Sequence, residues 1–300
     1  MLAVVAPGQG SQAPGLLNPW LDLPGVRESV GAAGEAVGLD LLTLGTVAGE
    51  DELVPTEVTQ PLVVATALAV VRAAGLRPDV VAGHSVGEWA ATALAGVLDD
   101  ATAVRLVGTR GRAMAAASAL TPTGMSAVIG GDAAEVAAAV ETHGLSIANH
   151  NANGQVVAAG PRDGLAALAA APPAKARVVP LRVAGAFHTH FMEPAVAEVS
   201  AALSEVPADV ISDPQVTLLS NADGAVVTSG AEALRRLVRQ VASPVRWDRC
   251  SDTLARLGVT HLVELPPAGT LAALAKRALP GVQVVALTSP ADLDVLASTA

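Results

Sequence analysis

The sequence predicts an α/β protein in which a smaller ferredoxin-like subdomain is inserted into a parallel-sheet domain. Two short apolar runs, residues 2–6 and 79–84, each end at a glycine-containing turn, which is typical of strands buried on both faces of a parallel sheet. Between residues 123 and 184 the elements become shorter and follow the order βαββαβ, the ferredoxin-like pattern. We therefore assign 1–122 and 185–300 to a large subdomain and 123–184 to the insertion.

The first part of the large subdomain predicts alternating strands and helices. A helix is expected over residues 60–74, because a proline fits its first turn and a glycine follows its last. Two more helices are expected over residues 86–98 and 102–117. The second apolar strand is thus followed at once by a helix, so Ser85 lies on the turn between them.

The insertion is expected to hold four strands and two helices before the chain returns to the main sheet. Asp132 fits the N-cap of the first of these helices, with Glu135 three residues later and Gly144 at its end. A strand over residues 178–185 is expected to re-enter the main sheet and to deliver His188 at its end. The elements expected in the insertion span residues 125–129, 132–144, 145–149, 155–159, 165–171 and 177–183, and later main-sheet strands span 216–220, 261–264 and 282–287.

Composition limits the kinds of partner. The 28 acidic and 18 basic side chains give a net charge of −10, which repels nucleic acid and anionic membranes over most of the surface. With no Tyr, two Phe and three Trp, the chain has few rings on which bases could stack. We expect no nucleic-acid or membrane partner, and any anionic partner must meet a local basic patch.

Signals for export or membrane insertion are missing from the sequence. The first residues, MLAVVAPGQG, lack the positively charged start of a signal peptide, and the apolar stretch 58–71 is too short to cross a bilayer. Cys250 is the only cysteine, so no intramolecular disulfide can form. A reducing cytoplasm is therefore expected.

Residues 83–87, GHSVG, match the nucleophile elbow, in which a serine occupies a sharp turn between a strand and a helix. At the start of that helix, backbone N–H groups and the helix dipole would face an oxyanion formed at Ser85. The motif can arise by chance in a glycine-rich chain. The strand before it and the helix after it favour a nucleophilic serine.

GQGSQA at residues 8–13 imitates a dinucleotide-binding fingerprint that follows a strand. Pro14, Gly15 and Pro19 argue against the long helix that such a site needs, and no strand ending in an acidic residue follows at a distance of about 20 residues. The turn can instead offer a backbone N–H as a second oxyanion donor, matching that of Val86.

His188 is the candidate general base among six histidines, because active sites in parallel sheets collect at strand ends. His84 and His190 remain alternatives, although strand alternation would point His84 away from Ser85. No spacing of histidines and carboxylates resembles a metal site, so no bound metal is expected.

Arg110 has the most apolar helical-wheel neighbours of the three arginines in its segment, namely Leu106, Val107, Ala113 and Met114. An arginine aimed into an apolar face needs a carboxylate partner. That carboxylate belongs either to a structural Asp or Glu or to a substrate, and the composition favours the structural one.

Several ordered motifs span nearly the whole chain. They are GQGSQ at residues 8–12, TQPL at 59–62, GHSVGE at 83–88, the arginine at 110, GAFH at 185–188, SPVRW at 243–247 and ELPPAGTL at 264–271. As a set they resemble those of the malonyl-CoA:acyl carrier protein transacylase family. The departure is ELPPAG, where the family more usually has a Gly-Pro-Gly run.

The resemblance implies a hydrolase-like large subdomain with a ferredoxin-like insertion, and it assigns roles to individual residues. Ser85 matches the nucleophile, His188 the general base and Arg110 the group that binds the malonyl carboxylate. The backbone N–H groups of Gln9 and Val86 match the oxyanion hole. The remaining matches are Gln60 and Asn151, which line the cleft, and Arg246, whose main-chain carbonyl orients the histidine.

The implied reaction is a ping-pong transfer of malonyl from malonyl-CoA to the phosphopantetheine thiol of acyl carrier protein through an ester on Ser85. No bound cofactor is required, since coenzyme A enters as part of the substrate. Phe187 before the histidine resembles the malonyl-selective members of the family. Three alternatives stay open: an acyltransferase serving a polyketide synthase, a serine thioester hydrolase, and a carrier-docking module without catalysis.

Overall fold

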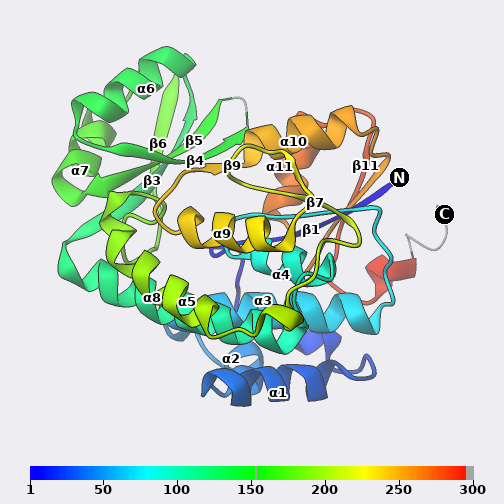
Figure 1. Ribbon diagram of the computed structural model, residues 1–300. Helices are drawn as coiled ribbons and strands as arrows, with labels where there is room; N and C mark the ends of the chain where they lie inside the picture. The colour runs from blue at the N-terminus through cyan, green and yellow to red at the C-terminus, as the bar shows by residue number, and fades with distance from the viewer. Residues whose placement is uncertain (153, 295–300) are drawn as a thin grey trace.

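The computed structural model describes residues 1–152 and 154–294 and contains two sheets, each covered by helices (Figure 1). The strands of the larger sheet are β1 (Leu2–Ala6), β2 (Val80–Gly83), β7 (Thr217–Leu219), β8 (Val226–Val227), β10 (His261–Glu264) and β11 (Gln283–Ala286). Their order is β11-β10-β1-β2-β7-β8, and all neighbours are parallel except β7 and β8. The two apolar runs predicted from the sequence form the centre of this sheet.

Alternation along the central strands gives the larger sheet two buried faces. Val4 and Val81 pack into a core with helices on one face, whereas Ala3 and Val5 pack against α10 (Trp247–Arg256) and α11 (Thr270–Ala278) on the other. The helices that share the first core are α1 (Val26–Val37), α2 (Leu41–Thr46), α3 (Thr56–Ala73), α4 (Gly87–Leu94), α5 (Asp100–Leu120), α8 (Glu193–Ser204) and α9 (Gly230–Gln240).

The insertion forms the second sheet, drawn in green in Figure 1. Its elements are β3 (Thr123–Gly130), α6 (Ala133–Thr142), β4 (Ser146–Ala152), β5 (Gln155–Pro161), α7 (Arg162–Ala170) and β6 (Ala176–Pro180), which is the predicted βαββαβ order. The sheet order is β6-β3-β5-β4, antiparallel throughout, and β9 (Val245–Arg246) from the large subdomain adds a fifth strand parallel to β4.

The prediction that a strand over residues 178–185 carries the chain back to the main sheet is wrong. β6 ends at Pro180, and residues 181–189 form a loop. Side chains help to hold this loop: Ala186 N–H donates to Thr123 Oγ1 at 3.0 Å, and Thr189 Oγ1 donates to Ala186 O at 2.6 Å. Its first residue, Leu181, still donates to Met125 O in β3 at 3.0 Å, and His188 N–H donates to Val241 O at 3.2 Å. The apolar residues after Pro180 continue the pattern of β6, which explains the misreading.

Helix boundaries differ from the prediction by a few residues. α3 begins at Thr56, four residues before the predicted start, and α4 ends at Leu94 instead of residue 98. Asp99 is the N-cap of α5, and its side chain accepts from Thr102 N–H at 2.8 Å. The short 3₁₀ turns are η1 (Asn18–Trp20), η2 (Glu50–Leu53), η3 (His190–Met192) and η4 (Ala208–Val210).

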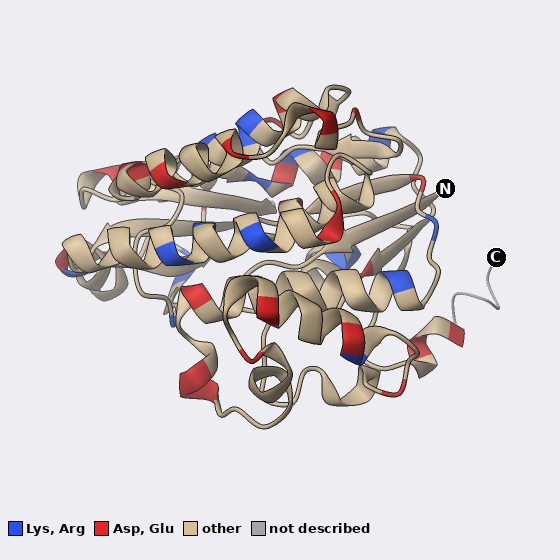
Figure 2. Cartoon of the chain, turned by 60° about the horizontal axis from the view of Figure 1, so that its bottom comes forward, with Lys and Arg blue, Asp and Glu red and all other residues tan. Residues whose placement is uncertain are grey.

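Acidic and basic residues are interspersed along the helices (Figure 2). None of the helices that the structure describes is both long and apolar enough to span a membrane.

Candidate active site

Ser85 occupies the sharp turn between β2 and α4, with a φ of +54°. A left-handed backbone is strained for a residue with a side chain and persists where the surroundings impose it. A Cβ on Gly83 would lie 2.1 Å from the carbonyl carbon of Gly87, and a Cβ on Gly87 would lie 2.3 Å from Ala6 O. Only glycine fits at either position, so the spacing of the motif follows from the tightness of the turn.

His188 and Ser85 form a nucleophile–base pair. His188 Nε2 lies 2.7 Å from Ser85 Oγ, and His188 Nδ1 lies 2.7 Å from the main-chain oxygen of Gln240. Because a carbonyl oxygen only accepts, Nδ1 carries a proton, and Nε2 is left to accept the proton of the serine hydroxyl.

Burial lowers the pKa of His188 to about 3, and the positive charge of Arg110 is the second cause of this shift. The imidazole is therefore neutral at pH 7. A neutral imidazole is the form that a general base needs.

The predicted role of Arg246 is wrong, because the carbonyl that orients His188 belongs to Gln240. Arg246 lies in β9, where its N–H donates to Asn221 O at 2.8 Å and its guanidinium pairs with Asp248 at 2.6 Å. Gln240 is the last residue of α9. Carbonyls in the last turn of a helix have no partner inside the helix and are available to outside donors.

The other two histidines considered from the sequence contact residues other than Ser85. His190 is exposed, and its ring lies 4.1 Å from the ring of Phe191. His84 also lines the cavity, but its Nε2 is 2.8 Å from Asn151 Oδ1, and its ring packs edge-on against Trp247 at 5.9 Å. Of the three candidates, only His188 is hydrogen-bonded to Ser85.

Arg110 reaches the nucleophile from α5 and is 1% exposed. Its Nη1 donates to Gln60 Oε1 at 2.6 Å, and its Nη2 lies 3.1 Å from Gln240 Oε1 and 3.3 Å from Ser85 Oγ. Among residues 1–152 and 154–294, no Asp or Glu oxygen lies within 4.0 Å of it. The structural carboxylate that composition favoured is thus missing from the described residues.

The buried guanidinium of Arg110 stays charged at neutral pH. Burial lowers its pKa to about 9, while the charge of Glu88 acts in the opposite direction. Its Nε has no hydrogen-bond partner among the described residues. A buried cation held only by neutral amide and hydroxyl oxygens is incompletely compensated, which indicates a place for an anionic ligand.

Two backbone N–H groups border the nucleophile. Gln9 follows the end of β1 and Val86 is the N-cap of α4, and both line the cavity. Within the described parts of the chain, neither N–H donates to a protein acceptor. Their predicted role as oxyanion donors is compatible with this arrangement and stays a prediction.

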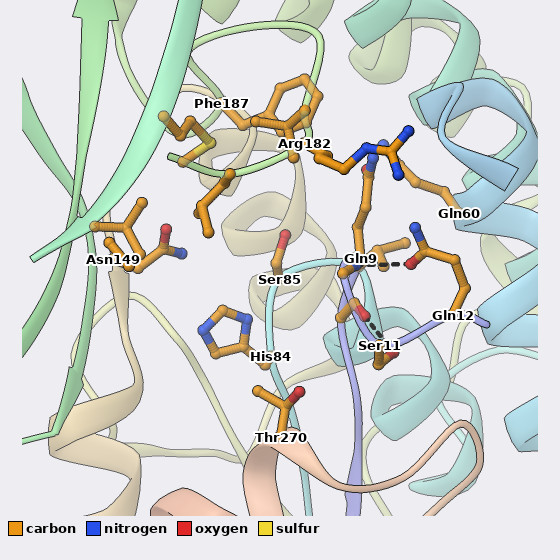
Figure 3. Close-up of a pocket in the computed structure, with 18 of the residues that line it drawn as sticks. Gln9, Ser11, Gln12, Gln60, His84, Ser85, Asn149, Arg182, Phe187 and Thr270 are labelled. Carbon is orange, nitrogen blue, oxygen red and sulfur yellow. Dashed lines mark hydrogen bonds between the residues drawn. The ribbon is translucent and has the colours of Figure 1, made fainter. Parts of the chain in front are cut away.

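The site lies in a cavity of about 520 Å³ between the large subdomain and the insertion (Figure 3). The predicted site residues that line it are Gln9, Gln60, Ser85, Val86, Arg110, Asn151 and His188. The insertion contributes Met125, Ala127, Asn149 and Val157, and Phe187 adds a ring beside the base. Of the predicted site residues, Arg246 alone is absent from the lining.

Three residues that hold the site in place received no role from the sequence. Asn221 Oδ1 accepts from Ser85 N–H at 2.8 Å, and its Nδ2 donates to Gly83 O at 2.7 Å. Gln240 and Glu88 complete this buried polar cluster, with Gln240 Nε2 donating to Glu88 Oε2 at 2.6 Å. Glu88 closes the GHSVGE motif, which was the one sequence signal that pointed to the cluster.

Residues with metal-binding side chains do not gather in the described structure: no group of three or more His, Cys, Asp or Glu there could hold a metal ion. Cys250 is a buried free thiol whose Sγ lies 3.4 Å from Ser220 O. Burial raises the pKa of this thiol far above its usual value, so it is unreactive as a nucleophile.

Known proteins match this chain over nearly its whole length. Residues 4–290 match the family model of the acyl transferase domain. The malonyl CoA-acyl carrier protein transacylase of Mycobacterium tuberculosis is 52% identical over 304 residues, covering 99% of this chain and 100% of the relative. The corresponding Escherichia coli protein is 36% identical, with 97% of each chain covered.

Solved structures match equally well. A crystal structure of MCAT from Mycobacterium tuberculosis has a TM-score of 0.94 and 52% identity, covering 99% of each chain. A complex of a type II PKS acyl-carrier protein with its malonyl-transacylase contains a chain with a TM-score of 0.92 and 31% identity, covering 100% of this chain and 99% of that one.

Proposed function

Because this chain belongs to the acyl transferase domain family, we propose that it transfers malonyl from coenzyme A to the phosphopantetheine thiol of acyl carrier protein. The observation that carries the proposal is the buried guanidinium of Arg110, 3.3 Å from Ser85 Oγ and without a carboxylate partner among the described residues. A malonyl group on Ser85 has a free carboxylate that can pair with this guanidinium in a bidentate manner. An acetyl group has none.

The first half of the reaction forms an ester on the nucleophile. His188 Nε2 takes the proton of Ser85 Oγ, which attacks the thioester carbonyl of malonyl-CoA. The N–H groups of Gln9 and Val86 donate to the resulting oxyanion. When the carbon–sulfur bond breaks, the proton on His188 passes to the coenzyme A thiolate, and malonyl stays on Ser85.

The second half reverses these steps with a different thiol. The phosphopantetheine thiol of the carrier protein gives its proton to His188 and attacks the ester carbonyl. Collapse of the second tetrahedral intermediate returns the proton to Ser85 Oγ and releases malonyl-carrier protein. The neutral state of His188 at pH 7 supports both proton transfers.

The reaction as proposed needs no bound cofactor or metal, since serine, histidine and two backbone N–H groups supply every step. We place it in the cytoplasm, where the single cysteine stays reduced. We further propose that the carrier is that of fatty-acid synthesis. A polyketide carrier is the second candidate, because one structural neighbour was solved with a type II PKS carrier protein.

Intact-mass measurement in two steps tests the proposal. Malonyl-CoA alone should add one malonyl group to the protein, and acyl carrier protein added afterwards should remove it and gain the same mass. If the malonyl group leaves the protein by hydrolysis as fast without carrier protein as with it, the protein is instead a thioester hydrolase. Failure to form an adduct would indicate a docking module. Comparing kcat/KM for fatty-acid and polyketide carriers separates the two pathways.

A further inference from the structure

Glu88 is a buried carboxylate that the proposed chemistry does not use. It lies in the first turn of α4, three residues after the nucleophile, and is 4% exposed. Within residues 1–152 and 154–294, no basic nitrogen comes within 4.0 Å of its carboxylate. Burial raises its pKa to about 7. A carboxylate in such a place depends on hydrogen-bond donors to compensate its lost hydration.

Two of its donors are residues that hold the reacting groups. Glu88 Oε2 accepts from Gln240 Nε2 at 2.6 Å, and the carboxylate accepts from Asn221 N–H at 3.1 and 3.2 Å. Gln240 Oε1 accepts from Arg110 Nη2 at 3.1 Å, and Asn221 Oδ1 accepts from Ser85 N–H at 2.8 Å. The carboxylate of Glu88 is therefore linked to Arg110 through Gln240 and to Ser85 through Asn221.

The carboxylate of Glu88 fixes which way the Gln240 amide points. In its ionised form, which prevails above pH 7, Glu88 only accepts hydrogen bonds, so it must meet the NH₂ end of that amide. The oxygen end is then left for Arg110, which only donates. If the amide turned over, its NH₂ would face the guanidinium and its oxygen would face the carboxylate, and both hydrogen bonds would be lost.

We propose that Glu88 is a positioning residue for malonyl selectivity, which fixes the Gln240 amide so that its oxygen holds Arg110 ready for the substrate carboxylate. This inference rests on the proposed function. Glu88 touches no reacting atom and acts through Gln240.

Glu264 provides a matched comparison, because it is also a fully buried carboxylate. Its oxygens accept from the N–H groups of Gly269, Leu271 and Ala272 at 2.7 to 2.9 Å, at the start of α11. All three N–H groups donate to Glu264, and none of them donates to Ser85, His188 or Arg110. Removal of Glu264 should therefore lower stability without changing the choice of acyl group.

The test compares Glu88→Met, Glu88→Gln and Glu264→Gln by kcat/KM for malonyl-CoA and acetyl-CoA, with a thermal melt for each. In Glu88→Met the acceptor is gone, so the malonyl-to-acetyl ratio should fall about tenfold. Glu88→Gln keeps one oxygen for both donors and should restore the ratio to within about threefold of wild type. Glu264→Gln should lower Tm and leave the ratio unchanged.

Gln240→Met keeps the proposal testable if Glu88→Met fails to fold. It removes the amide between Glu88 and Arg110 while the main-chain carbonyl that binds His188 remains, so it should lower the ratio by a similar factor. Equal losses for the two acyl groups in folded Glu88→Met, or an unchanged ratio in Gln240→Met, would overturn the positioning role. A wild-type protein that forms no malonyl adduct would instead overturn the proposed function.

Discussion

The two walls of the cavity differ in what they contribute. The large subdomain contributes Ser85, His188 and Arg110, together with the amides and carboxylate that hold them. The insertion contributes mostly apolar side chains, with Asn149, Asn151, Gln155 and Arg182 as its polar members. At the nucleophile turn, a hydrogen bond joins His84 to Asn151. Reacting groups thus concentrate on one wall, while the other shapes the space for the substrate.

This difference follows from how each sheet is built. The central strands of the larger sheet are parallel, so their carboxyl ends and the start of α4 meet at one edge, where backbone N–H groups are unpaired. The strands of the insertion are antiparallel and keep their backbone groups in the ladder. We therefore expect substitutions on the first wall to affect chemistry and those on the second to affect KM.

The largest effect is expected from Ser85→Ala. No malonyl-enzyme should form, because the hydroxyl that is paired with His188 is removed. Intact mass after incubation with malonyl-CoA measures this directly. Ser11→Ala is the control, since Ser11 lines the same cavity but its hydroxyl donates to Gly8 O at 2.7 Å. A stable adduct on Ser85→Ala would place the nucleophile elsewhere.

His188→Ala should come next, with a loss in kcat of about 10² to 10⁴ and little change in substrate binding. Single-turnover acylation of Ser85 by malonyl-CoA measures the loss. His190→Ala should behave as wild type, because that ring is exposed and outside the cavity. If the two variants acylate at the same rate, the base is not His188.

Arg110→Ala should reduce kcat/KM for malonyl-CoA by about 10² to 10³, since removing one partner of a buried ion pair costs about 3 to 5 kcal/mol. Acetyl-CoA, which has no free carboxylate, should be transferred as well as before or better. Arg110→Lys keeps the positive charge but loses the bidentate geometry of the guanidinium, so its kcat/KM for malonyl-CoA should lie between those of wild type and Arg110→Ala.

The control for this series is Arg105→Ala, an exposed arginine on the same helix, which should leave both substrates unaffected. Equal losses for malonyl-CoA and acetyl-CoA in a folded Arg110→Ala protein would show that Arg110 is structural.

The same arginine should also set the pH dependence on the acid side. The positive charge of Arg110 helps lower the pKa of His188 to about 3, because it disfavours a second cation nearby. In Arg110→Ala the burial remains but the charge is gone, so the pKa of His188 rises part of the way back. The acid limb of kcat/KM for acetyl-CoA should therefore move to higher pH, within the range where both proteins stay folded. A limb that stays in place or moves to lower pH contradicts this electrostatic account.

Residue types and spacing predicted those parts of the molecule that depend on side chains. The apolar runs gave the central strands, GHSVG gave the elbow, and the βαββαβ order gave the insertion. The approach of His188 was mispredicted, because the loop after β6 is held by Thr123 and Thr189 and continues an apolar pattern without being a strand.

Backbone acceptors and paired buried side chains were the parts that sequence could not supply. Any residue has a carbonyl, so nothing distinguished Gln240 from Arg246 as the partner of His188. Asn221 lies 136 positions after Ser85 in the sequence, and only the fold brings the two residues together. For Arg110, the residues alone left a structural or a substrate carboxylate open, and the family resemblance assigned it the malonyl carboxylate. The structure adds that no carboxylate oxygen lies within 4.0 Å of it among the described residues.

Asn151→Ala should have the smallest effect and is the most direct test of the contrast between the walls. Asn151 Oδ1 accepts from His84 Nε2 across the cavity, and a net hydrogen bond of this kind is worth about 0.5 to 1.5 kcal/mol. We expect KM for malonyl-CoA to rise by about two- to tenfold while kcat stays within about twofold of wild type. Steady-state kinetics measure both constants.

The control is Asn149→Ala, because Asn149 lines the same wall and its side chain makes no protein hydrogen bond among the described residues. This variant should change KM less than Asn151→Ala does. The two asparagines share a strand, so any general loosening of β4 affects both and cancels in the comparison. If Asn151→Ala lowers kcat by more than tenfold with KM unchanged, the His84–Asn151 contact supports the chemistry itself. The insertion would then belong to the catalytic wall, and the two walls would not divide chemistry from binding.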